Sequence, residues 1–135
     1  MASEELFEVR VEVDFRATHS VGPDGAPAEA HEHRWQVAVR ARSERLDAIA
    51  IVVDFRKLRH DAEAVVARLD GTVLEGHEAF ADGPATAAAV GEWILRRLEP
   101  TVGTGDYRIV AVEVECDRGI RWVTGREAVA ARRPV

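Results

Sequence analysis

Cysteines, long apolar runs and secretion signals are scarce or missing in this chain of 135 residues. Its single cysteine, Cys116, cannot form an internal disulfide framework, which excludes the class of small disulfide-stabilised secreted domains. No apolar run approaches the roughly 18 residues that a membrane-spanning helix needs. The N-terminal stretch MASEELFEVR lacks the apolar core of a signal peptide. We therefore expect a cytoplasmic protein with no membrane partner.

Positive charge is also in short supply. The chain has 18 Lys and Arg against 24 Asp and Glu, which gives a formal net charge of −6. An acidic chain is a poor match for nucleic acid or an acidic membrane surface, because both select basic patches. Internal repeats and polar low-complexity tracts are missing as well. The length is usual for one globular domain with a packed core, so we expect residues 1–135 to form a single domain.

The first part of the chain alternates apolar and polar side chains over residues 7–15, which is the pattern of a half-buried strand. The apolar face consists of alternate residues, namely Phe7, Val9, Val11, Val13 and Phe15. Continuing the alternation places Ala17 and His19 on that face. The segment SVGPDGAPA follows and is rich in residues that break strand pairing, so it predicts a loop.

The second predicted strand runs over residues 31–41 and carries a His-x-His pair at its start. Because successive side chains of a strand point to opposite faces, His31, His33 and Trp35 share one face. An antiparallel hairpin of the two strands would therefore gather the three histidines at one end of its apolar face.

Helical periodicity follows in the middle of the chain. A short apolar run, IAIVVDF, leads into a predicted helix over residues 55–70, with Asp54 as N-cap and Gly71 as a left-handed C-terminal residue. A second helix is predicted over residues 86–98 and is expected to end at Pro100. The apolar stripe of the first helix has spacings of three and four and consists of Phe55, Leu58, Ala62, Val65, Val66 and Leu69.

The last part of the chain returns to strands. The segment YRIVAVEVEC predicts a third strand and GIRWV a fourth, joined by a short turn. Alternation along the third strand puts Glu113 and Glu115 on the same face as Ile109 and Ala111. The predicted fold is therefore a two-layer α+β domain, a four-stranded antiparallel sheet with two helices on one face. Such a sheet leaves two edges open, which favours assembly into a homo-oligomer.

The three histidines admit two interpretations at this point. Three neutral imidazoles with an open fourth position describe a catalytic zinc site, and His19 could complete the set that His31 and His33 begin. The alternative is a group of partly exposed imidazoles near a loop, because a His-x-His pair is a weak motif on its own.

Six segments follow one another at near-constant spacing over about residues 7–123: FRATHS, HEHRWQVAVRA, IVVDFRKL, LDGTVLEGHEAF, PATAAAVGEWI and VAVEVEC. Together they resemble the family of 6-pyruvoyl-tetrahydropterin and 6-carboxy-tetrahydropterin synthases. In this resemblance His19, His31 and His33 match the family's three zinc ligands. It implies the T-fold, an oligomeric barrel that is usually a hexamer built as a dimer of trimers, and Zn²⁺ as cofactor. It also implies active sites at subunit interfaces and 7,8-dihydroneopterin triphosphate as substrate.

The sequence departs from the family pattern at the catalytic positions. The family's catalytic cysteine falls on Pro27, which has no ionisable atom, and Cys116 stands far along the chain on another predicted strand. The family's Asp-His pair reads Asp70-Gly71, so the histidine is missing and the aspartate stands alone. The metal site is therefore expected to be kept while the usual acid and base groups are altered.

Other residues are candidates for the lost roles. Glu29 precedes His31 by two residues, and some relatives use a glutamate near this position; a metal would also acidify the hydroxyl that such a base deprotonates. His77 is a second candidate if its loop folds back, and otherwise it is a surface histidine. Glu115 matches the glutamate that anchors the pterin ring in the family, and otherwise it is a solvated residue at a strand end. Asp70 completes the set of candidate catalytic residues.

Three functions follow from these observations. The first is a zinc-dependent pterin-type lyase that acts on 7,8-dihydroneopterin triphosphate or a similar heterocycle. The second is a divergent zinc- and pterin-binding protein without the ancestral synthase activity. The third uses only the oligomeric scaffold, with a vestigial metal site.

Overall fold

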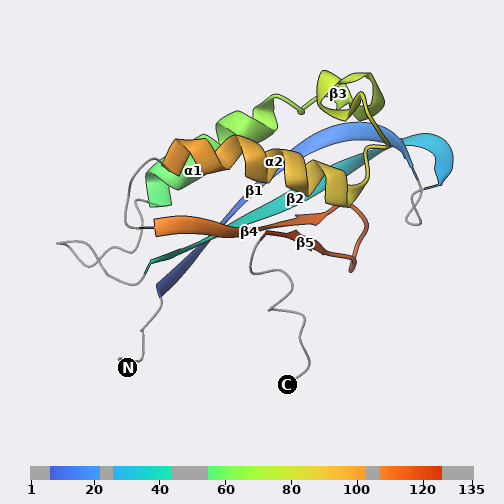
Figure 1. The fold of residues 1–135 in the computed structure, drawn as a ribbon. Helices are drawn as coiled ribbons and strands as arrows, with labels where there is room; N and C mark the ends of the chain where they lie inside the picture. Colours follow the sequence, from blue (N-terminus) through green and yellow to red (C-terminus); the bar gives the residue numbers. More distant parts are fainter. Residues whose placement is uncertain (1–6, 22–25, 44–54, 103–106, 126–135) are drawn as a thin grey trace.

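The computed structural model describes residues 7–21, 26–43, 55–102 and 107–125. In these residues a five-stranded sheet carries two helices on one face (Figure 1). The strand order is β3-β1-β2-β4-β5, and every neighbouring pair is antiparallel except the short β1–β3 pair. The α+β class and the two helices on one face agree with the prediction. The predicted number of strands was four, and the sheet has five.

The first two strands are longer than the alternation predicted and form one hairpin. β1 (Phe7–Val21) pairs with β2 (Pro27–Ser43) in a register that runs from Phe7 opposite Ser43 to His19 opposite His31. The apolar face continues through Ala17 and His19, which are 1% and 4% exposed. The expected position of His19 on the apolar face is therefore confirmed.

α1 (Phe55–Ala67) packs on β1 and ends three residues earlier than predicted. Its buried side chains belong to the predicted stripe, but Phe55 is 49% exposed and lies outside the core. Gly71 has φ +75°, which confirms a left-handed residue after the helix. The predicted N-cap Asp54 and most of the apolar run IAIVVDF lie outside the described residues.

A short strand after Gly71 explains the fifth member of the sheet. The backbone N–H of Gly71 donates to the carbonyl of Arg16 (2.7 Å), which brings the chain alongside β1. β3 (Thr72–Val73) then pairs with β1 in parallel, and the sequence pattern did not predict this strand. Two 3₁₀ turns follow, η1 (Leu74–Gly76) and η2 (Glu78–Phe80).

α2 (Ala87–Val102) begins at its Thr86 cap and passes through Pro100, so the prediction that Pro100 ends the helix is wrong. Proline removes only one backbone N–H, and polar side chains bind other carbonyls of the last turn. The Thr101 hydroxyl donates to the Leu98 carbonyl (2.7 Å), and Lys57 Nζ donates to the Thr101 carbonyl (2.9 Å). The last turn of α2 is thus held by a side chain of α2 itself and by one of α1.

β4 (Tyr107–Glu115) contains a bulge that changes its facing pattern. Arg40 lies opposite Ala111 and Ala41 opposite Ile109, which leaves Val110 without a register partner. Ile109 therefore faces the helices, whereas Ala111, Glu113 and Glu115 face the other side. The predicted common face of Ile109 and the glutamates is wrong for this reason. The sheet ends with β5 (Trp122–Thr124), which pairs with β4.

The core lies between the helices and the sheet face that they cover. Its fully buried large side chains come from both layers and include Trp35, Val39, Leu58, Ile94, Leu98 and Val112. The opposite sheet face carries mainly charged side chains. Within the described residues, no helix is long and apolar enough to cross a membrane.

Ile94 provides a test of this packing, because its side chain is 0% exposed on α2. We expect Ile94→Ala to lower the free energy of unfolding by about 2–5 kcal/mol through lost burial and a cavity. The matched control is Ile120→Ala, since Ile120 is 45% exposed; its effect should stay within about 0.5 kcal/mol. Chemical denaturation measures both, and equal losses would contradict the described core.

Candidate metal centre

The hairpin register brings the three predicted ligands together at one end of the helix-covered face. His19 lies opposite His31, and Ala17 lies opposite His33. The ring centroid of His19 is 4.7 Å from that of His31 and 4.9 Å from that of His33. The centroids of His31 and His33 are 4.3 Å apart. One donor atom from each ring lies within 4.8 Å of the others. The geometry therefore groups three imidazoles closely enough for a single ion.

Backbone carbonyls fix the tautomers of two of these rings. His19 Nδ1 lies 3.0 Å from the carbonyl oxygen of Ala85, and His31 Nδ1 lies 2.6 Å from that of Glu29. A carbonyl oxygen only accepts, so each Nδ1 carries the hydrogen and donates it. In the neutral imidazole the Nε2 atom then keeps a free lone pair. Metal-binding histidines commonly have this kind of supporting hydrogen bond.

The Nε2 atoms of two rings have no hydrogen-bond partner among the described residues. His19 Nε2 and His33 Nε2 are both buried and unpaired. An unsatisfied buried polar atom costs about 1–3 kcal/mol, so a folded protein rarely leaves two of them side by side. A cation that accepts both lone pairs would remove this cost. The residues therefore fit a metal, and three imidazoles suit zinc among other transition ions.

The local electrostatics favour the ligand form of His33. Burial lowers the pKa of this ring below its ordinary value, and repulsion by His31 and His19 lowers the pKa further, whereas Asp117 raises it. The ring therefore stays neutral to a lower pH than an ordinary histidine. Neutral imidazole is the form that binds a metal ion.

A second group of potential ligands adjoins the cluster through His33. One donor atom each of His33, Cys116 and Asp117 lies within 4.8 Å of the others. His33 Nε2 is 3.9 Å from Asp117 Oδ1. Burial, together with the charges of Asp117 and Glu115, raises the pKa of the Cys116 thiol to about 11. The expectation that Cys116 is remote from the histidines is therefore wrong.

Strand pairing explains how Cys116 reaches this place. Gln36 lies opposite Glu115 on the charged face, so the next residue of the chain, Cys116, turns to the helix-covered face. The alternation along the predicted third strand contains this signal, because Cys116 directly follows Glu115. The sequence could not identify the partner strand, however, and the register depends on the bulge at Val110.

The structure places the three proposed catalytic residues outside both clusters. The side chain of Glu29 is exposed at the start of β2, where its backbone carbonyl holds His31. Asp70 Oδ1 accepts the backbone N–H of Arg16 (2.9 Å). His77 Nδ1 accepts the backbone N–H of Ala79 (3.0 Å).

The ring of His77 also makes aromatic contacts, with centroids 6.2 Å from Phe80 and 5.9 Å from Trp93. Of these three residues, Glu29 contacts the histidine cluster, through its backbone carbonyl and not through its side chain. The sequence pattern could not indicate these partners, because Asp70 accepts from distant Arg16 on β1 and His77 accepts from Ala79 in a 3₁₀ turn.

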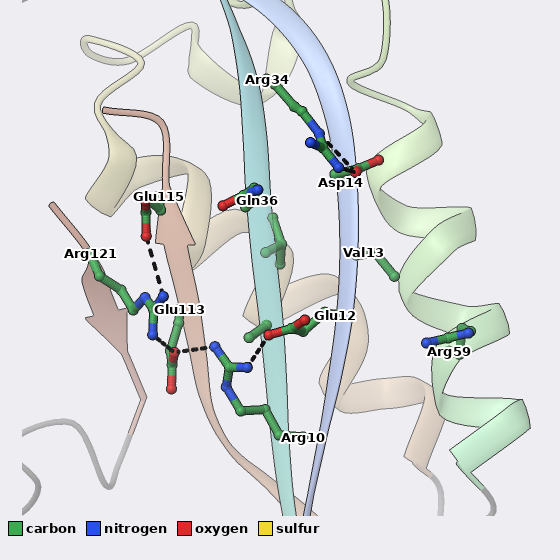
Figure 2. A pocket seen from close by; sticks show the side chains of 12 residues that line it. Arg10, Glu12, Val13, Asp14, Arg34, Gln36, Arg59, Glu113, Glu115 and Arg121 are labelled. Atoms are coloured by element: carbon green, nitrogen blue, oxygen red, sulfur yellow. Dashed lines mark hydrogen bonds and ion pairs between the residues drawn. The ribbon is translucent and has the colours of Figure 1, made fainter. Parts of the chain in front are cut away.

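Glu115 lies on the opposite face of the sheet from the histidines. It lines a cavity of about 330 Å³ with Glu113, Arg10 and Arg121, and Figure 2 shows these side chains converging. Arg121 donates to both carboxylates at 3.3 Å, and Arg10 donates to Glu113 at 3.0 Å. The Gly119 N–H also donates to Glu115 (3.2 Å). Within one chain, the carboxylate proposed to anchor the pterin ring is thus held in an ionic network.

Comparison with known proteins decides the family. The family model described as 6-pyruvoyl tetrahydropterin synthase matches residues 8–126. The chain belongs to this family. The resemblance inferred from the six sequence segments is therefore confirmed. No curated protein sequence is significantly similar to the chain.

Solved structures share the T-fold of this family member. The 6-pyruvoyl tetrahydropterin synthase of Caenorhabditis elegans is 16% identical, with a TM-score of 0.78 over 93% of this chain and 99% of that one. The synthase of Plasmodium vivax is 17% identical, with a TM-score of 0.71 over 89% and 97%. An uncharacterized protein from Wolinella succinogenes is 16% identical, with a TM-score of 0.74 over 91% and 99%. At these identities the likeness establishes the fold.

Proposed function

We propose that this family member is a zinc-dependent pterin-type lyase that acts on 7,8-dihydroneopterin triphosphate or a similar heterocycle. The observation that carries the proposal is the cluster of His19, His31 and His33, in which the buried Nε2 atoms of His19 and His33 have no partner in the part of the chain that the structure describes. Membership of the 6-pyruvoyl tetrahydropterin synthase family supports a pterin as substrate.

Bound zinc would supply a Lewis acid that lowers the pKa of a coordinated hydroxyl. The chain's own residues hold and orient that site. Three neutral ligands leave the charge of a divalent ion uncompensated, so the site favours oxygen ligands that carry or develop negative charge. The carbonyls of Ala85 and Glu29 keep the rings of His19 and His31 in the ligating tautomer.

Glu29 is our proposed substitute for the missing catalytic cysteine. It is close in the chain to Pro27, where the resemblance places that cysteine, and its backbone contacts His31. One solved Plasmodium vivax structure is of a catalytic residue mutant in which a glutamate is replaced by alanine, so a family member uses a glutamate in catalysis. Asp70 and His77 are further proposed acid or base groups, and Glu115 is the proposed pterin anchor.

Assembly bears on these roles, because the proposed residues are spread over both faces of one sheet. We propose a homo-oligomer, a hexamer built as a dimer of trimers, with sites between subunits. Such an assembly would surround the exposed Glu29 side chain and the open end of the histidine cluster with residues of neighbouring chains. The small sheet with two edges supports association of this kind.

The second candidate is a zinc- and pterin-binding protein that has lost the ancestral chemistry. Three observations favour it: Pro27 has no ionisable group, Gly71 stands in place of the family histidine, and the Asp70 carboxylate already accepts the Arg16 N–H. These positions concern proton transfer, and they leave the metal ligands intact.

The metal is the first prediction to test. Purified protein should contain about one zinc per chain, and His33→Ala should lose it, because two imidazoles hold zinc much more weakly than three. His60→Ala is the matched control, since His60 is exposed on α1, and it should keep the metal. Elemental analysis measures all three proteins, and a zinc-free wild type would contradict both candidate functions.

Turnover distinguishes the two candidates. Incubation of the zinc-loaded protein with 7,8-dihydroneopterin triphosphate should release triphosphate or acetaldehyde, and chelation of the metal should stop the release. Product analysis by liquid chromatography measures both products. Tight binding of the pterin without any product would instead support the binding protein.

Glu29→Gln tests the proposed base. Loss of a positioned acid or base lowers kcat by about 10²–10⁴-fold, while zinc content should be unchanged because Glu29 supplies only its carbonyl to His31. Glu32→Gln is the matched control on the same strand and should keep the wild-type rate. An unchanged rate in Glu29→Gln would remove this residue from the mechanism, and the same comparison applies to His77→Asn.

A further inference from the structure

His33 joins two groups of ligating side chains, and this shared position has a consequence for the metal. His33 belongs to both groups, and its Nε2 atom lies 3.9 Å from Asp117 Oδ1 in the second group. A metal ion bound to His33 Nε2 would therefore lie near Asp117 and Cys116, the next potential ligands from the chain.

The need for an ion at this place is independent of the cysteine. His19 is 4% exposed, its Nε2 atom has no hydrogen-bond partner among the described residues, and its ring is 4.9 Å from that of His33. The buried Nε2 atoms of His19 and His33 thus belong to residues of one cluster, which Cys116 adjoins through His33.

The distances allow the thiol to reach an ion held by His33. With zinc–nitrogen and zinc–sulfur lengths of about 2.1 and 2.3 Å, a tetrahedral site separates nitrogen and sulfur by about 3.6 Å. The donor atoms of Cys116 and His33 lie within 4.8 Å of each other. Relative to His33, the sulfur therefore needs to approach by at most about 1.2 Å. Cys116 lies in the group of His33 and Asp117, not in that of His19 and His31. The end of β4 would therefore have to move the sulfur towards the ion.

Position and chemistry favour Cys116 over Asp117 as the residue that makes it. Cys116 packs against the hydrophobic core at the end of β4, whereas the Asp117 side chain is 39% exposed in the following turn. Thiolate is among the ligands that zinc prefers, and the half-buried Cys116 is held against the core.

We propose that Cys116 is a fourth protein ligand of the metal bound by His19, His31 and His33. The inference rests on the proposed function only for the presence of the metal. A thiolate in the fourth position would make the resting site a closed one, and a coordinated thiol loses its proton. A substrate hydroxyl would then reach the metal by displacing the sulfur or by adding a fifth ligand.

Cobalt substitution tests the ligand directly, because a Co²⁺–thiolate bond gives an intense near-ultraviolet charge-transfer band that Co²⁺–imidazole bonds lack. The full chain, freed of metal with a chelator and loaded with Co²⁺, should show this band. Cys116 is the only cysteine of the chain, so the band can come from no other residue. Cys116→Ser should lose the band while keeping its Co²⁺, and the matched control Asp117→Asn should retain it.

The outcomes separate this inference from the proposed function. A wild-type protein that binds one Co²⁺ per chain without the band would overturn the role of Cys116 and leave the three-histidine site standing. A protein that binds neither Co²⁺ nor Zn²⁺ would overturn both. The deciding spectrum is that of the wild type, so the test stands even if Cys116→Ser fails to fold.

Discussion

The candidate site depends on the pairing register between β1 and β2. In this register His19 lies opposite His31, and the helix-covered faces of both strands, with buried Phe15, Ala17 and Trp35, continue into the three imidazoles. A slip of one residue would turn every side chain of one strand to the other face and would separate His19 from its partners. Because Phe15 stacks on Trp35 in the same register, core packing and ligand placement enforce one another.

The two faces of the sheet have different chemistry as a result. The helix-covered face holds the core and, at its end, the three histidines; the Nε2 atoms of His19 and His33 are buried there without a hydrogen-bond partner among the described residues. The other face holds ion pairs, among them Arg10 with Glu113 and Arg121 with Glu115. The first face therefore offers imidazole nitrogens to a cation, whereas the carboxylates of these ion pairs on the second face already have arginine partners.

Local patterns in the sequence predicted a large part of this arrangement. Strict alternation identified both strands of the hairpin and put His19 on the buried face, because the period of two is a property of the strand alone. The parallel β3 was missed, since two residues carry no periodicity, and the end of α2 was misplaced because Pro100 lies in the last turn, where it removes only one backbone N–H. The contact of Cys116 with the cluster depends on pairing between distant strands. The carbonyls that hold His19 and His31 belong to the backbone, and a pattern of side chains cannot predict which backbone groups a ring will contact.

The bulge in β4 has a chemical effect some distance from where it lies. Val110 adds one residue to the strand without adding one to the pairing, so every position after it changes face relative to an unbroken ladder. Glu115 and Cys116 follow it as immediate neighbours with opposite orientations. One unpaired valine thus determines whether this strand turns sulfur or oxygen towards the helix-covered face with the histidines, and hence whether the potential ligand that it offers there is soft or hard.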